Sequence, residues 1–242
     1  MKNFFRSIQT FFPSLHDLRF SLKFCRMRVS KTPHENDFNA LKLFNFDKDD
    51  VLVDVGSNRG EAIASILLAK NLSNKIIGFE PNGLIFEKLE AKFRKNDRVT
   101  VHNFGLGKKE EELKLFVPFY RKWMFDGLSS FNYDDAANWL RTRLWNYQEK
   151  KLTVKEVACK TKSMDSLNLK PAFVKIDVQG FELEVLEGGK STIEKYKPIL
   201  LIEAISEEVI AFLKPFGYEF YSYANGKLTQ GKGKLNTFCI VK

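Results

Sequence analysis

Residues 51–60 read VLVDVGSNRG, and this stretch decides the fold. The apolar run Val51–Val55 leads into a turn that contains Gly56 and Gly60, and the helical pattern Glu61–Lys70 follows. Glycine permits a sharp turn and a close approach between the backbone and a ligand. An apolar run, a glycine turn and a helix in this order are typical of the first unit of an α/β sheet.

The same alternation of apolar runs and helical segments continues along the chain. The further runs are Lys75–Phe79, Val99–Phe104, Ala172–Val178 and Ile199–Ile202, and helical patterns lie near Gly83–Lys95 and Glu182–Leu186. Runs without polar alternation indicate strands that are buried on both faces, as in parallel sheets. Near the end, Tyr218–Tyr223 and Thr237–Val241 look like antiparallel edge strands. We therefore expect an α/β fold with a doubly wound, mostly parallel sheet.

Residues 1–46 are interpreted as an N-terminal helical extension that precedes the main domain, residues 47–242. Apolar residues recur there in steps of four and three, as on one face of a helix, at Phe4, Ile8, Phe11, Leu15, Leu18 and Leu22. Pro13 interrupts this stripe, and Ser14 with Asp17 predicts a new helix start. A third helix is expected to begin at Thr32, because Pro33 suits the first helical position.

The charge of the chain is uneven. Lys and Arg number 39 against 30 Asp and Glu, which gives a net charge of +9, and residues 1–35 carry part of the excess. Basic surfaces attract nucleic acid, anionic lipid or acidic sugars. The N-terminal helices are expected to dock on their own domain, on a second copy in a homo-oligomer, or on a membrane surface as a peripheral contact.

Composition excludes several classes of protein. No stretch approaches the roughly 20 apolar residues of a membrane-spanning helix. The three cysteines, Cys25, Cys159 and Cys239, form no CxxC pair, which argues against a disulfide scaffold and a zinc cluster. We expect a cytoplasmic protein, at most associated with the inner face of the membrane, and no metal requirement.

An aromatic-rich insertion is expected at residues 117–150. Nine aromatic residues, including all three tryptophans, fall within residues 117–147. An insertion between strands of an α/β core is where a substrate lid would lie. A satellite apolar cluster under a long loop is an equally good interpretation.

The glycine turn and a second acid indicate a nucleoside cofactor. Glu80 closes the next apolar run, twenty residues after Gly60, which suits a carboxylate that accepts from ribose hydroxyls. The pyrophosphate fingerprint G-x-G-x-x-G is absent, because Asn58 and Glu61 stand in it. An acid before the turn and no phosphate cradle favour a cationic cofactor such as S-adenosyl-L-methionine over a dinucleotide.

Several segments resemble the FkbM-type methyltransferases. They read VDVGSNRG at 53–60, GFEPN at 78–82, NFGLG at 103–107, TKSMDSL at 161–167, FVKIDVQGFE at 173–182 and VLEGG at 185–189. The resemblance extends from about Glu35 to Glu203 and is most specific in the last two segments. It implies a Rossmann-like class I methyltransferase fold with a seven-stranded sheet. It also implies methyl transfer from S-adenosyl-L-methionine to a hydroxyl group, often that of a saccharide or a secondary metabolite.

The resemblance also implies which residues bind the cofactor. The methionine side is expected at Asp54, Gly56, Ser57, Asn58 and Gly60, the ribose at Glu80 and Pro81, and the adenine at Asn103, Phe104 and Gly105, with Asp177 beside them. Ser57 stands where the family usually has Ala. Gln179 replaces the usual Glu, which removes a charge.

Transfer to an alcohol needs a base within hydrogen-bond reach of the hydroxyl. Asp177 ends a predicted strand and is the expected base, with Glu182 one turn beyond and Lys175 as an ion-pair partner. For Glu182, stabilisation of a helix N-terminus is the alternative role. His102 is a second candidate base, although packing within the strand is the favoured interpretation.

The acceptor is expected to be a small molecule or a saccharide. Residues expected to bind it are Asp126, Ser129, Ser130, Trp123 and Glu203. An RNA methyltransferase is an alternative, although no Asn/Asp-Pro-Pro-Tyr motif for base flipping is present and no nucleic-acid partner is expected. A second alternative is a catalytically silent binding module with the same fold, which the Gln179 replacement motivates.

Overall fold

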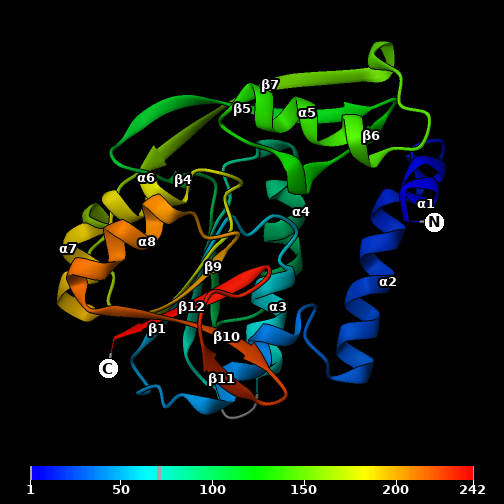
Figure 1. Cartoon of the computed structure of the whole chain (residues 1–242). Helices are drawn as coiled ribbons and strands as arrows, with labels where there is room; N and C mark the ends of the chain where they lie inside the picture. Colours follow the sequence, from blue (N-terminus) through cyan, green and yellow to red (C-terminus); the bar gives the residue numbers. More distant parts are fainter. Residues whose placement is uncertain (1, 70–71, 242) are drawn as a thin grey trace.

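The computed structural model describes residues 2–69 and 72–241. Its centre is an eight-stranded sheet with the order β11-β10-β12-β9-β8-β1-β2-β3 (Figure 1). The strands are β1 (Val51–Val55), β2 (Lys75–Phe79), β3 (Val99–His102), β8 (Pro171–Ile176), β9 (Ile199–Glu203), β10 (Tyr218–Ala224), β11 (Lys227–Gln230) and β12 (Asn236–Val241). Strands β3, β2, β1, β8 and β9 are parallel, and β12, β10 and β11 are antiparallel.

The doubly wound, mostly parallel α/β sheet expected from the sequence is confirmed. The described sheet has one strand more than the seven expected, because the turn at Asn225-Gly226 pairs β11 with β10 as a hairpin. Both turn residues have positive φ angles, as a tight hairpin turn requires.

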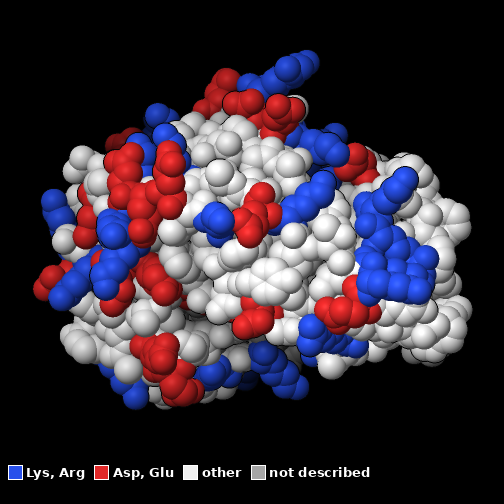
Figure 2. Space-filling model, turned by 90° about the horizontal axis from the view of Figure 1, so that it is seen from above, with Lys and Arg blue, Asp and Glu red and all other residues white. Residues whose placement is uncertain are grey.

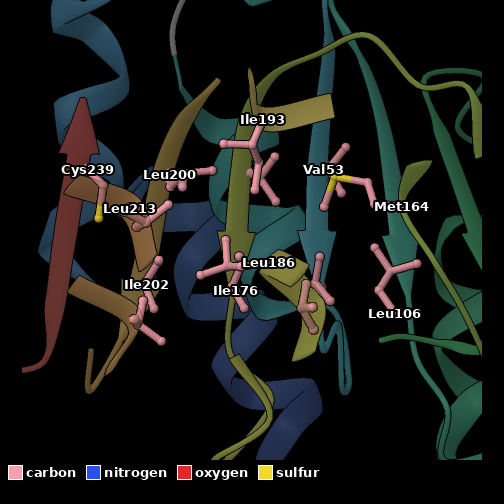
Figure 3. Packing of buried hydrophobic residues seen from close by; sticks show 14 of the residues in the cluster. Val53, Leu106, Met164, Ile176, Leu186, Ile193, Leu200, Ile202, Leu213 and Cys239 are labelled. Atoms are coloured by element: carbon pink, nitrogen blue, oxygen red, sulfur yellow. The ribbon is translucent and has the colours of Figure 1, made fainter. Parts of the chain in front are cut away.

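Helices cover both faces of the sheet, which explains the continuous apolar runs. One face packs against α6 (Glu182–Glu187), α7 (Lys190–Tyr196) and α8 (Glu207–Leu213), and the other against α3 (Glu61–Leu68), α4 (Gly83–Phe93) and the 3-10 helix η1 (Asn36–Leu43). In Figure 3, Val53, Ile176 and Ile202 from adjacent strands meet Leu186 and Leu213 from the helices. Leu52, the neighbour of Val53, packs into the opposite layer.

A second, four-stranded sheet with the order β4-β7-β5-β6 forms an arm, which we define as residues 105–162. Its elements are β4 (Gly105–Leu106), β5 (Glu111–Tyr120), β6 (Trp123–Met124), η2 (Asp126–Leu128), α5 (Tyr133–Arg143), η3 (Glu149–Lys151) and β7 (Leu152–Lys162). The arm lies above the main sheet in Figure 1. It is longer and more regular than the irregular insertion expected at 117–150. The long hairpin of β5 and β7 supplies the difference.

The N-terminal helices α1 (Lys2–Gln9) and α2 (Leu15–Ser30) lie along one side of the domain (Figure 1). Ser14 precedes α2 but makes no capping hydrogen bond with its side chain, and Asp17 points to other partners. The prediction that a helix begins at Thr32 is wrong. The 3-10 helix η1 begins at Asn36, because the His34 N–H donates to Ser65 Oγ and Glu35 is extended.

The expected end of the first domain helix at Lys70 lies outside the described residues, and the described part of α3 ends at Leu68. Within residues 2–69 and 72–241, every helix is too short or too polar to cross a membrane.

Candidate functional site

The glycine turn brings the ends of β1 and β8 together. Gly56 and Gly60 have φ angles of +83° and +89°, in the left-handed region that favours glycine. A Cβ atom at Gly56 would lie 1.9 Å from the backbone oxygen of Asp177. The turn therefore requires glycine at position 56, and its backbone lies directly against the loop that follows β8.

Glu80 is fixed at the end of β2 with its carboxylate directed at the same turn. Its Oε2 accepts from the N–H of Asn58 at 2.6 Å, and its Oε1 accepts from the N–H of Asn82 at 2.8 Å. The side chain is buried, and burial raises the pKa of Glu80 to about 7. Behind it, Asn103 Nδ2 donates to the backbone oxygen of Glu80 at 2.9 Å, which holds the strand end in place.

Asp177 and Gln179, which follow β8, and Glu203, the last residue of β9, form a group that we call the carboxyl cluster. The Nε2 of Gln179 donates to Asp177 Oδ1 at 2.9 Å and to Glu203 Oε2 at 3.1 Å. The ammonium of Lys175, which is buried, lies 3.6 Å from Asp177 Oδ2. The amide at position 179 thus bridges two carboxyl groups, where a Glu would add a third.

The two carboxyl groups of this cluster differ in protonation. Burial alone would raise the pKa of Asp177, but Lys175 and the hydrogen bonds from Glu203 and Gln179 outweigh it and lower that pKa. The adjacent Asp177 and burial raise the pKa of Glu203 to about 8. Within the pair, Asp177 is therefore the group that ionises more readily, and Glu203 is the group that more readily holds a proton.

Asp54 lies beneath the turn. It is buried beside Lys175, its partner in the register of β1 and β8. Its Oδ2 has no hydrogen-bond partner, and burial raises its pKa to about 7. Its expected contact with a cofactor stays a prediction.

The strand ends enclose a cavity of about 80 Å³. The expected site residues that line it are Gly56, Asn58, Glu80, Pro81, Gly105, Asp126, Ser129 and Asp177. The other expected cofactor residues are not in its lining. Ser57 is buried, Gly60 packs against Phe93, and Phe104 lies beside the rings of Phe79 and His102.

The chemistry of the cavity fits a cationic nucleoside cofactor. Asn58 lines the cavity, and its Oδ1 is a buried acceptor that has no hydrogen-bond partner. Glu80, also in the lining, offers carboxylate oxygens to a ribose. Asp177 supplies a negative charge. The volume is far below the roughly 300 Å³ of a typical ligand pocket, so the wall formed by residues 126–131 of the arm must move before a nucleoside enters.

One guanidinium links that wall to the glycine turn and to helix α2. The buried Arg59 donates from Nε to Asp126 of the arm, from Nη1 to Asp17 of α2 at 2.8 Å, and lies 2.9 Å through Nη2 from Nδ1 of His16. The Asp126 carboxylate is therefore engaged by Arg59. The sequence contains Arg59 in its central motif, but its partners are 42 and 67 positions away, and sequence reasoning assigned it no role.

The other residues of the arm that were expected to bind the methyl acceptor make contacts within the protein. Ser130 Oγ donates to the backbone oxygen of Gln179 at 3.0 Å, and Ser129 Oγ donates to that of Asp126 at 2.8 Å. Trp123 is buried, with its ring 4.5 Å from that of His16. Its position leaves no open ring face for a sugar.

A larger hollow, which we call the acidic cleft, opens beside the carboxyl cluster with a volume of about 800 Å³. Six acidic residues line it: Asp134, Asp135, Glu182, Glu184, Glu203 and Glu208. None of the described lining residues is Lys or Arg, and Trp139 contributes the aromatic surface. Of this lining, the sequence had singled out Ser130, Gln179, Glu182 and Glu203. Trp139 lies in the aromatic segment, but nothing in that segment distinguishes it from Trp123.

Glu182 and His102 have structural partners. Glu182 Oε1 accepts from the N–H groups of Gly180 and Val178 at 3.2 and 3.4 Å, and burial raises its pKa. It therefore braces the loop before α6. His102 stacks on Phe79, with a distance of 5.4 Å between ring centres, and burial lowers its pKa. These contacts agree with the packing roles weighed from the sequence.

Comparison with known proteins identifies relatives. The sequence profile of the methyltransferase FkbM domain matches residues 54–220. A search of curated proteins gave no match. Among solved structures, a methyltransferase FkbM from Methylobacillus flagellatus KT is similar with a TM-score of 0.52 and 17% sequence identity, over 81% of this chain and 45% of that chain. The present chain thus spans less than half of that protein.

Two further structures are more distant. A precorrin-6y C5,15-methyltransferase from Geobacter metallireducens GS-15 has a TM-score of 0.42 and 11% identity, over 86% of this chain and 90% of that chain. A fibrillarin from Aeropyrum pernix, in complex with natively bound S-adenosyl-L-methionine, has a TM-score of 0.43 and 11% identity, over 84% and 73%.

Proposed function

The chain belongs to the FkbM methyltransferase family, and from this premise we propose that it transfers a methyl group from S-adenosyl-L-methionine to a hydroxyl of a saccharide or similar polyol that carries no phosphate. The observation that carries this proposal is the carboxyl cluster of Asp177, Gln179 and Glu203 at the junction of the small cavity and the acidic cleft. Asp177 and Gln179 line the cavity, and Gln179 and Glu203 line the cleft.

The residues of the cavity account for cofactor binding. S-adenosyl-L-methionine, when bound, supplies an electrophilic methyl group on a cationic sulfur. Glu80 accepts hydrogen bonds from ribose hydroxyls, and Asn58 Oδ1 gains the donor that it lacks. The charge of Asp177 favours a cation nearby.

Asp177 serves as the base. Its lowered pKa keeps it ionised at neutral pH, and Lys175 and Gln179 hold the carboxylate in one orientation. In the transfer, the acceptor oxygen would gain the methyl carbon while the sulfur–methyl bond breaks, S-adenosylhomocysteine would leave, and the hydroxyl proton would pass to Asp177. Positioning of the two reacting groups supplies the larger part of the rate. The amide of Gln179 supports this role, because it neutralises none of the negative charge and adds no further repulsion.

The acidic cleft restricts the class of acceptor. A phosphate in a hollow lined by six acidic residues is repelled, whereas neutral hydroxyls donate hydrogen bonds to carboxylates and an ammonium group is attracted. Trp139 offers an aromatic face to the apolar side of a sugar ring. RNA and nucleotide sugars are therefore poor acceptors despite the net charge of +9.

The proposal is tested by transfer of labelled methyl from S-adenosyl-L-methionine to a panel of neutral glycans, amino sugars, their phosphorylated counterparts and tRNA. We expect label in the first two groups. Asp177→Asn should lower the rate by about 10²–10⁴-fold while S-adenosylhomocysteine still binds. Asp97→Asn, at an exposed position, is the control and should leave the rate unchanged. A preference for phosphorylated acceptors or tRNA would overturn the acceptor class, and failure to bind S-adenosylhomocysteine would overturn the proposed reaction.

A further inference from the structure

The N-terminal helices bury small polar side chains and expose large apolar ones. In α1 and the turn after it, the buried side chains are Ser7 and Thr10. Nine large apolar side chains of the two helices and the turn are exposed instead: Phe4, Phe5, Ile8, Phe11, Phe12, Leu15, Leu18, Leu22 and Val29. Their exposure reaches 64% for Phe5, 61% for Leu22 and 78% for Val29. Large apolar side chains exposed together on neighbouring helical turns mark an interaction site.

Helix α2 has two apolar faces, and the domain covers only one. Phe20, Phe24 and Met27 face the hollow between α2 and the helices α3 and α4. The outward residues recur in steps of three and four, which places them on one stripe: Leu15, Leu18, Leu22, Cys25 and Val29, all exposed. The outer stripe is therefore built to contact something other than this domain.

The charge beside the outer stripe is of one sign. Arg19, Arg26 and Arg28 are exposed on either side of it. The acidic Asp17 of α2 is already paired with Arg59 and with Lys88. Figure 2 shows Lys and Arg side chains gathered near one end of the molecule, next to uncharged surface. An apolar stripe with arginine flanks is complementary to an apolar layer bounded by negative charge.

A second copy of the chain does not meet this requirement. Two outer stripes packed on each other would bring Arg19 and Arg26 of one copy close to the arginines of the other, and like charges at such flanking positions disfavour pairing. Trp145 extends the surface, because its exposed ring lies 5.5 Å from that of Phe4. Exposed tryptophan is typical of the boundary between lipid chains and headgroups.

We propose that α1 and α2 lie flat on a lipid bilayer with anionic headgroups, with the outer stripe in the acyl boundary and the arginines at the headgroups. An interfacial helix of this type combines a buried apolar face with attraction to acidic lipid. The contact is peripheral, in agreement with the absence of a membrane-crossing helix among the described residues.

Sedimentation of the full chain with vesicles tests the proposal. One set contains phosphatidylcholine alone, and the other contains one quarter phosphatidylglycerol. We expect binding to the second set and tenfold weaker or no binding to the first. Equal binding to both sets, or to neither, would overturn the proposal.

Matched variants identify the surface. Leu18→Ser with Leu22→Ser should abolish sedimentation with acidic vesicles, whereas Leu43→Ser with Leu235→Ser, at similarly exposed positions elsewhere, should not. Arg19→Gln with Arg26→Gln should weaken binding roughly tenfold or more, and Lys227→Gln with Lys234→Gln is the matched control for charge.

The competing occupant is tested on the same proteins. Each variant is checked for S-adenosylhomocysteine binding, which reports a folded domain. A wild-type dimer in light scattering that Leu18→Ser with Leu22→Ser converts to monomer, without vesicle binding, would assign the stripe to self-association and overturn the proposal.

Discussion

Asp126→Asn is the substitution that most directly tests the closed arm. Asp126 and Arg59 form an ion pair in which the side chains are 7% and 5% exposed. The substitution keeps the size of the side chain and removes its charge. Arg59 then retains Asp17 as its acidic partner, and the Asp17 side chain is more than half exposed.

The magnitude follows from this burial. Removal of one partner from a buried pair costs about 3–5 kcal/mol, and the remaining Asp17 places the loss at the lower end, about 3 kcal/mol. For a chain of this length that corresponds to a fall in Tm of roughly 6–12 °C. The same change should raise the association rate of S-adenosylhomocysteine by up to about a hundredfold, because residues 126–131 must move before the ligand enters the cavity.

Thermal unfolding and stopped-flow binding measure the two effects. Glu149→Gln is the control, because it removes an ion pair with Arg141 that lies on the same arm but is exposed. Exposed pairs contribute little, so both measurements should match the wild type. If Asp126→Asn also matches the wild type in both measurements, Arg59 does not hold the arm closed.

Three further predictions concern the carboxyl groups and the turn. Because the pKa of Glu203 is raised to about 8, its stabilising contribution is complete below its unfolded pKa of about 4.3 and is lost as pH rises through 8. Glu203→Gln should therefore flatten the decline of the free energy of unfolding between pH 5 and 8, by up to about 1.4 kcal/mol per pH unit in urea titrations, and an unchanged slope would contradict the assignment. Gly56→Ala should cost more than about 4 kcal/mol in denaturation experiments, since its Cβ meets the next loop at 1.9 Å, whereas Gly226→Ala, at a φ of +80° with open space around it, should cost about 1–2 kcal/mol; equal losses would refute the steric argument. Glu80→Gln should weaken S-adenosylhomocysteine binding in calorimetry about 10- to 100-fold, through a lost charge-assisted hydrogen bond, and full affinity would remove Glu80 from the ribose site.

The sheet is predictable because its signal is local. Strands buried on both faces are mostly apolar, so runs such as Val51–Val55 and Ile199–Ile202 mark them directly. The turn at Gly56 and the acid at Glu80 have fixed spacing to those strands. The fold and the cofactor edge of the site therefore follow from short segments of sequence.

The remaining features depend on contacts between distant segments. Ser14 and Asp17 have the pattern of a helix start, but Arg59 binds the Asp17 carboxylate. Asp126 was expected to bind the methyl acceptor, but its carboxylate is paired with the same guanidinium. The acidic cleft joins residues of the arm, α6 and α8, which no spacing along the chain brings together. The polar and apolar alternation of β5 and β7 is present in the sequence, where the aromatic residues of the same segment are the more conspicuous pattern.

Arg59 connects three parts of the molecule: the glycine turn to which it belongs, the arm and helix α2. A change in the free energy of α2 therefore also changes the stability of the arm position. By linkage, a change at the arm affects α2 by the same free energy. If a bilayer favours one orientation of α2, it changes the affinity for the methyl donor by a certain factor. The donor must then change the affinity for the bilayer by that same factor.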